Sequence, residues 1–161
     1  MPEMRIRRER KVKRKPLSIA QRKAVYSKCN GRCAYCGTPI EYKQMQVDHV
    51  VPIELGHIVM AEGGDPNNLK NCLPACRSCN YIKSSMMPEK FRRYISGLIE
   101  SLARDSVTYR NAVRFGMVEE KPHTPQFYFE KLGVKTAGYL SDFDEMYRKN
   151  VVRLEKEEEA E

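Results

Sequence analysis

The sequence has no tryptophan and no long apolar run. Its longest apolar runs, such as residues 58–61, are far shorter than the roughly 20 residues that span a bilayer. The basic N-terminus also lacks the apolar segment that a secretory signal needs. We therefore expect a soluble protein without a membrane partner. We also expect a reducing compartment, where paired cysteines more often bind metal than each other.

A large hydrophobic core is also missing. Hydrophobic residues make up 41% of the 161 residues and charged residues 31%, which is typical of a small core extended by polar helices and tails. Because compact domains commonly contain roughly 100–150 residues, we expect one domain and no second full core. The net charge of +8 and the pI of about 9.2 favour a polyanionic partner, with nucleic acid as the first candidate.

The two ends of the chain carry charges of opposite sign. Residues 1–15 hold eight basic residues against two acidic ones, and residues 155–161 hold five acidic residues against one basic residue. We predict a flexible basic arm at 1–15 that neutralises phosphates, although a solvated tail that only aids solubility, or a nuclear-type address, would have the same composition. Between this arm and the acidic tail we expect a core domain at 16–87 and a mostly helical extension at 88–154.

The core segment carries signals for two helices and two strands. Ser18 and Gln21 form a capping-box pattern that predicts a helix near 19–29, and Asn30-Gly31 supplies its end. Valine-rich residues 45–53 predict a strand. Turn-forming residues predict an irregular loop at 54–70, followed by a second short strand at 71–75 and a helix from Arg77.

The C-terminal extension carries helical signals as well. Pro88 marks a helix start, and an apolar stripe to about residue 103 predicts a helix that covers the core domain at 16–87. A shorter helix is expected at 106–115, ending at Gly116. Residues 127–129 form either a strand or an aromatic plug, and Ser141 caps a final helix through about residue 153.

Two CxxC pairs are the strongest chemical signal. Cys33 and Cys36 form the first pair, Cys76 and Cys79 form the second, and 39 residues separate them. Four thiolates suit tetrahedral zinc and leave no open position, so the zinc would be structural. Disulfides or chance spacing are the alternatives. The two remaining cysteines, Cys29 and Cys72, lie at apolar positions and are expected to be small buried hydrophobic residues.

Polar residues of a recognisable order lie between and beside these pairs. Asp48, His49 and Pro52 follow the first pair. Asn71, Pro74 and Ala75 precede Cys76, and Asn80 and Lys83 follow Cys79. With the cysteines, this combination over residues 33–83 resembles the zinc-knuckle branch of the HNH endonucleases. Residues up to 131 look similar to the C-terminal part of small phage and bacterial members. The resemblance implies an α+β protein with a ββα-metal finger, structural zinc and helical flanks.

The resemblance also implies roles. Asp48 and Asn80 would hold a catalytic Mg²⁺ or Mn²⁺ through hard oxygen ligands, and His49 would be the general base, because an imidazole suits proton transfer at neutral pH. The products would carry 5′-phosphate and 3′-hydroxyl ends. Neighbouring strand residues point to opposite faces, so Asp48 and His49 can flank one phosphate only if the strand twists or bulges there.

The roles of several supporting residues have more than one interpretation. The residue that orients His49 is expected to be Asn71, from its five-residue distance to Cys76, with Asn68 as the alternative. Lys83 and Arg77 are expected to contact phosphate, unless they only form a solvated helix face. His57 and His123 stand outside the motif and are expected to be ordinary surface residues.

The leading hypothesis is a metal-dependent endonuclease that cuts or nicks double-stranded DNA in the cytoplasm of a bacterial or phage-infected cell. Cleavage of both strands would favour a homodimer. The second hypothesis is a zinc-ribbon nucleic-acid-binding module without catalysis, which would not need Asp48, His49 and Asn80. A zinc-stabilised protein-interaction domain would explain the acidic tail, but neither those residues nor the basic arm.

Overall fold

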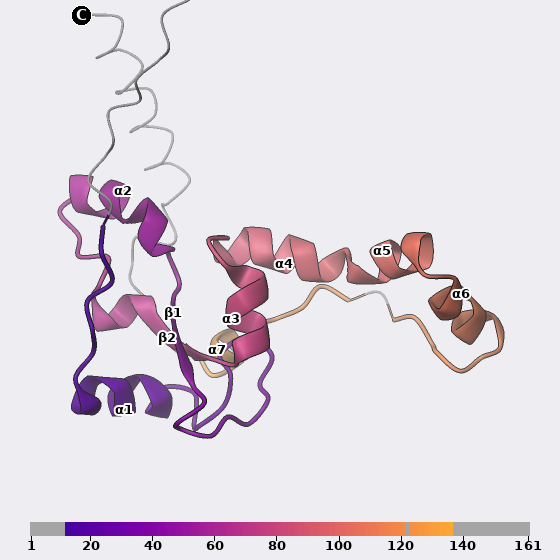
Figure 1. Ribbon diagram of the computed structural model, residues 1–161, viewed down its shortest axis with the longest axis horizontal. Helices are drawn as coiled ribbons and strands as arrows, with labels where there is room; N and C mark the ends of the chain where they lie inside the picture. Colours follow the sequence, from indigo (N-terminus) through magenta and orange to yellow (C-terminus); the bar gives the residue numbers. More distant parts are fainter. Residues whose placement is uncertain (1–11, 122, 137–161) are drawn as a thin grey trace, which may run out of the picture.

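The computed structural model describes residues 12–121 and 123–136, and all structural statements concern these residues. The elements of the N-terminal half surround a two-stranded sheet, and the helices within residues 98–114 extend away from it (Figure 1). In chain order the larger elements are α1 (Ile19–Ser27), β1 (Gln46–His49), α2 (Gly56–Ala61), β2 (Cys72–Ala75), α3 (Arg77–Lys83), α4 (Pro88–Ser96), α5 (Leu98–Asp105), α6 (Val107–Arg114) and α7 (Tyr128–Lys131).

Helix α1 begins where the local signals place it but ends earlier. Ser18 Oγ accepts a hydrogen bond from the Gln21 backbone, and Gln21 Oε1 accepts one from the Ser18 backbone, so the predicted capping box is confirmed. After Ser27 the chain turns through Asn30 and Gly31, whose φ angles of 52° and 71° are left-handed. The helix is thus two residues shorter than predicted, and its Val25 packs against Met45 and Cys72.

Strands β1 and β2 pair antiparallel, with Asp48 opposite Leu73 and His49 opposite Cys72. The prediction of a strand over 45–53 was too long, because β1 ends at His49. Residues Val50 and Val51 are buried, but their backbone amides bond to Asn71 rather than to a strand. The predicted second strand and the helix beginning at Arg77 are confirmed.

The segment predicted as an irregular loop contains helical structure. It forms a 3₁₀ turn at Ile53–Leu55, helix α2, and a second 3₁₀ turn at Leu69–Asn71. The reason is a small apolar cluster, in which Ile58 and Val59 pack against Val51. The prediction was wrong because the many turn formers in this segment concealed one short amphipathic stretch.

An aromatic cluster closes the core over the first CxxC pair. The ring of Tyr35 lies 5.4 Å from that of Phe91 and 5.2 Å from that of Phe127, both edge to face, and 6.1 Å from that of Phe129. The Phe129 amide donates to the Ala34 carbonyl at 2.8 Å. Of the two predicted forms for residues 127–129, the aromatic plug is therefore confirmed, with α7 beginning within it.

The helix predicted from Pro88 to about residue 103 is divided at Gly97, which ends α4 and begins α5. Only α4 covers the core, through the buried Phe91. Beyond Gly97, helices α5 and α6 project away from the core (Figure 1), and neither has a buried residue. The predicted helix at 106–115 is confirmed as α6. The predicted final helix, the acidic tail and most of the basic arm lie outside the described residues.

Within the described ranges, no helix has the length and apolar character needed to cross a membrane.

Candidate functional site

The four CxxC cysteines come together at one point of the core. All four Sγ atoms lie within 4.8 Å of one another, and the Sγ atoms of Cys36 and Cys76 are 3.9 Å apart. A tetrahedral zinc with Zn–S bonds of about 2.3 Å would hold its sulfurs about 3.8 Å apart. The cluster therefore fits a metal ion, and no cysteine among the described residues is in a disulfide.

Local structure sets up this cluster. Cys33 and Cys36 lie on a tight turn in which the Gly37 amide donates to the Cys33 carbonyl at 2.9 Å, and Gly37 has a left-handed φ of 74°. Cys76 is the N-cap of α3, and its Sγ accepts a hydrogen bond from the Cys79 amide. A hydrogen bond with the Cys79 thiol lowers the pKa of Cys33 to about 5 and raises the pKa of Cys79. Metal binding would release the proton that this pair shares.

The two remaining cysteines take no part in the cluster. Cys29 and Cys72 are buried, and burial raises the pKa of each thiol to about 11. They are small core residues, as predicted.

Asp48 lies on β1 and is 3% exposed. Its carboxylate accepts a hydrogen bond from the Tyr35 hydroxyl, and its Oδ2 lies 3.0 Å from Lys83 Nζ. Burial raises the pKa of Asp48, while Lys83 and Tyr35 act in the opposite direction by stabilising the carboxylate. The carboxylate is thus the centre of a buried polar group of three side chains.

The structure corrects the expectation for Lys83. Its side chain is fully buried, and Nζ donates to the His49 carbonyl at 3.0 Å as well as bonding to Asp48. A lysine held in this way is not placed at the surface to contact phosphate, contrary to the prediction. By contrast, Arg77 on the first turn of α3 is exposed.

His49 is the last residue of β1 and is 6% exposed. Its Nδ1 is buried without a hydrogen-bond partner among the described residues. Burial lowers its pKa, the charge of Arg14 lowers it further, and Asp48 and a hydrogen bond with the Asn67 side chain raise it. The net effect is a lowered pKa, which favours the neutral form of the His49 imidazole.

Asp48 and His49 follow each other in the chain but have different neighbours. The one-to-one register of β1 and β2 continues through His49 without a bulge. Because β1 ends at His49, a twist at the end of the strand is the remaining way for both side chains to flank one phosphate. The Asp48 side chain contacts Tyr35 and Lys83, whereas the His49 ring lies near Asn67 and Arg14.

Of the two candidate asparagines, Asn71 is the one built into the turn after His49. It is fully buried, its Oδ1 accepts from the Val51 amide at 2.9 Å, and its Nδ2 donates to the carbonyls of Val51 and Pro66. Asn68 is exposed and only caps the 3₁₀ turn at the Lys70 amide. Of the two, only Asn71 is bonded to the turn after His49, while the side chain that bonds to the His49 ring is that of Asn67.

Asn80 lies on α3, three residues before Lys83, and is half-buried. Residues three apart share one side of a helix, and Lys83 faces Asp48. The helix therefore turns the side that carries Asn80 toward the sheet.

The residues around His49 include some that sequence patterns did not reveal. Asn67 Oδ1 accepts from the Lys15 amide at 2.9 Å, and Asn67 Nδ2 donates to the Lys13 carbonyl at 3.2 Å. Residues 12–15 of the predicted flexible arm are thus fixed beside the histidine. Neither Asn67 nor Tyr35 stands at a motif position, so only the folded chain brings them to the site.

Comparisons with known proteins agree with this arrangement. The CRISPR-associated endonuclease Cas9 of Corynebacterium diphtheriae is 36% identical over 56 residues, which are 35% of this chain and 4% of that protein. The Cas9 of Actinomyces naeslundii is 40% identical over 53 residues, 33% of this chain and 4% of its own length. The chain thus matches only a small part of these relatives. Residues 33–85 match the family model "HNH endonuclease", and this segment, with its two strands, following helix and four-cysteine cluster, is an HNH endonuclease domain.

Proposed function

We propose that the protein is a metal-dependent endonuclease that hydrolyses phosphodiester bonds of double-stranded DNA, with His49 as general base. The observation that carries the proposal is the setting of His49 within the HNH segment. It is a neutral, largely buried imidazole with an unpartnered Nδ1, directly after a buried carboxylate. A neutral imidazole can accept a proton from the attacking water. Asn71 would keep the ring in place by holding the turn that follows it.

Asp48 and Asn80 would hold one Mg²⁺ or Mn²⁺ ion. A carboxylate and an amide oxygen are suitable hard ligands. Asp48 already binds one cationic group, the Lys83 ammonium. When bound, the metal would stabilise the charge on the phosphate and on the departing oxygen. Zinc at the four cysteines would hold the base of the site together.

The charge distribution supports DNA as the partner. The chain carries a net charge of +8, Arg77 is exposed on α3, and Arg14 lies close enough to His49 to lower its pKa. Such cations neutralise phosphates and supply affinity that does not depend on sequence. The two relatives are named as endonucleases of bacteria, which supports the same activity in a bacterial or phage-infected cytoplasm, with residues 16–87 as the catalytic unit.

A specific observation favours a second candidate, a zinc-stabilised nucleic-acid-binding module without catalysis. Both oxygens of Asp48 are engaged by Tyr35 and Lys83, and the side chain is 3% exposed. A carboxylate with these partners is sufficiently explained by a structural role.

The deciding experiment is cleavage of supercoiled plasmid by the purified protein with Mg²⁺ or Mn²⁺, beside His49→Ala and the matched control His57→Ala. We expect nicked or linear product from wild type and the control, and a loss of about a hundredfold or more in His49→Ala. If wild type and His49→Ala both bind DNA but are equally inert with every metal, the binding module is correct and the nuclease proposal fails.

A further inference from the structure

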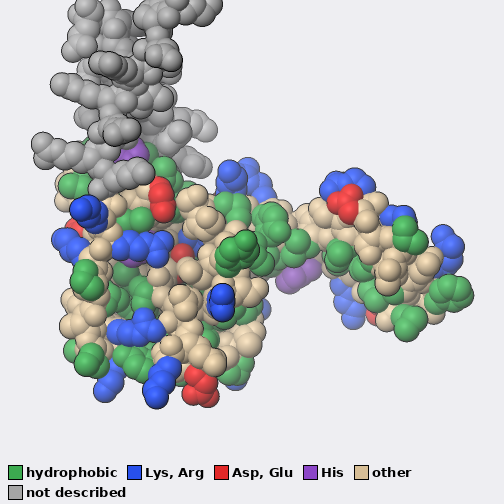
Figure 2. Space-filling view, viewed as in Figure 1, with side chains coloured by type: hydrophobic (Ala, Val, Ile, Leu, Met, Phe, Trp, Pro, Cys, Tyr) green, Lys and Arg blue, Asp and Glu red, His purple; other side chains and the backbone are tan. Residues whose placement is uncertain are grey.

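Helices α5 and α6 and the turn after them, residues 98–118, form a helical arm whose apolar side chains are uncovered. The arm holds seven of the twelve exposed large hydrophobic side chains of the described chain, and in Figure 2 they lie along its length and at its end. They are Leu98, Ile99, Leu102, Val107, Phe115, Met117 and Val118. Exposed apolar side chains concentrated on one projecting element mark an interaction site.

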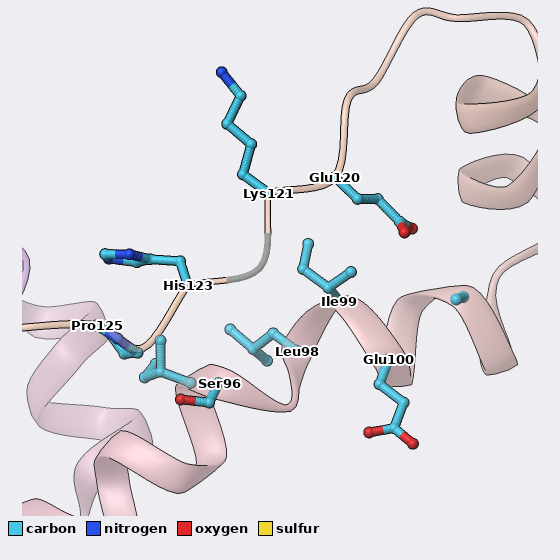
Figure 3. Close-up of a pocket in the computed structure, with 10 residues that line it drawn as sticks. Ser96, Leu98, Ile99, Glu100, Glu120, Lys121, His123 and Pro125 are labelled. Carbon is cyan, nitrogen blue, oxygen red and sulfur yellow. The ribbon is translucent and has the colours of Figure 1, made fainter.

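A cavity lies at the base of the arm. It has a volume of about 520 Å³ and is formed by residues around the α4–α5 junction together with Glu120, Lys121, His123 and Pro125 of the returning chain. Leu98 and Ile99 point from the helix toward this segment (Figure 3). Glu100, Glu120, Lys121 and His123 supply the polar part of its lining. The volume is in the range of pockets that bury an apolar group.

The far end of the arm carries two side chains that could fill such a cavity. Phe115 is 77% exposed and Met117 is 80% exposed. They flank Gly116, whose left-handed φ of 70° ends α6, and the Met117 amide donates to the Ala112 carbonyl at 2.8 Å. The turn therefore presents both side chains on a hydrogen-bonded backbone, and little ordering is needed when they bind.

We propose that the helical arm is a homodimer interface, in which Phe115 and Met117 of each copy enter the cavity at the base of the other copy's arm. One chain carries both the insert and the cavity, so a two-fold arrangement satisfies both at once. The charges beside Phe115 and in the cavity lining agree with a second copy of the chain as the occupant. Arg114 is exposed next to Phe115, and the cavity lining carries two carboxylates, those of Glu100 and Glu120, against one ammonium, that of Lys121. The dimer does not rest on the proposed nuclease activity.

The first test is the oligomeric state of the full chain by sedimentation velocity over a concentration series. We expect a dimer for wild type and for the control Ile19→Asp, which changes a 74% exposed apolar residue on α1, away from the arm. Phe115→Asp and Leu98→Asp should each weaken dimerisation about thirtyfold or more, the effect of losing a central anchor. Both positions are exposed, so far-ultraviolet circular dichroism should show unchanged folds.

The second test mixes the two variants. Phe115→Asp retains an intact cavity and Leu98→Asp retains an intact insert, so their mixture can restore one of the two contacts. We expect a larger dimer fraction in the mixture than in either variant alone. The proposal is overturned by a monomeric wild type, by dimers that neither substitution weakens, or by a mixture that gains nothing.

Discussion

The ammonium of Lys83 lies 3.0 Å from Oδ2 of Asp48, and both side chains are buried. This contact joins α3 to β1, so it fixes the helix and the strand on which the HNH segment is built. The same ammonium donates to the carbonyl of His49. One lysine therefore links the candidate metal ligand, the backbone of the candidate base and the helix that carries Asn80.

Replacing this lysine should destabilise the fold strongly. Lys83→Met leaves the buried Asp48 carboxylate without its cation, and loss of one partner of a buried pair costs about 3–5 kcal/mol. Urea unfolding of the purified protein would measure the change. The double variant Lys83→Met with Asp48→Asn removes both charges and should recover much of the loss. A single variant within about 1 kcal/mol of wild type, the range of exposed pairs, would show that the contact contributes little.

Removing the metal from the four-cysteine cluster should unfold the core. We expect one zinc per chain by elemental analysis, and its loss in Cys33→Ser or Cys79→Ser, because structural zinc in small folds contributes apparent free energies of about 10–16 kcal/mol. Cys72→Ala is the matched control, since that thiol is buried but lies outside the cluster. Full zinc content in the serine variants would contradict the assignment.

The four-cysteine cluster could be predicted from the sequence because CxxC spacing is a local property that the chain carries into any fold. The roles of Lys83 could not be predicted from the sequence. Its position one turn after Cys79 suggested a surface contact, yet the side chain is buried by Asp48 and by Tyr35, a residue between the first two cysteines that no motif marks.

Helices α4 and α5 show a similar limit of prediction from sequence. The apolar stripe from Phe91 to Leu102 is continuous in the sequence, so it predicted one helix over the core. The chain divides at Gly97, and only tertiary contact decides that Phe91 is buried while Leu102 is 43% exposed. Periodicity identifies an apolar face, but it does not say whether this chain or another molecule covers that face.

The loss of folding free energy on substitution by alanine should be much larger at Asn71 than at Asn68. Asn71→Ala leaves the amide and carbonyl of Val51 without their partners, so we expect a loss of about 2–4 kcal/mol, because each unsatisfied buried group costs about 1–3 kcal/mol. Asn68→Ala removes an exposed cap and should cost about 1 kcal/mol or less. Thermal unfolding measures both. Plasmid cleavage at a temperature where both are folded should fall only in Asn71→Ala, and equal losses would contradict the assignment.

Arg14 should contribute to DNA binding beside the candidate base. The Asn67 side chain holds the backbone on both sides of Arg14, at Lys13 and Lys15, so the position of the arginine is set by the fold. Arg14→Ala should weaken binding of a short duplex to a similar extent for unrelated sequences, and should lower the slope of log affinity against log salt by about 1. Fluorescence anisotropy at several salt concentrations measures both quantities. Lys131→Ala, which removes an exposed charge on α7, is the charge-matched control. If the two variants lower the slope equally, net charge accounts for the effect and Arg14 has no special place at the site.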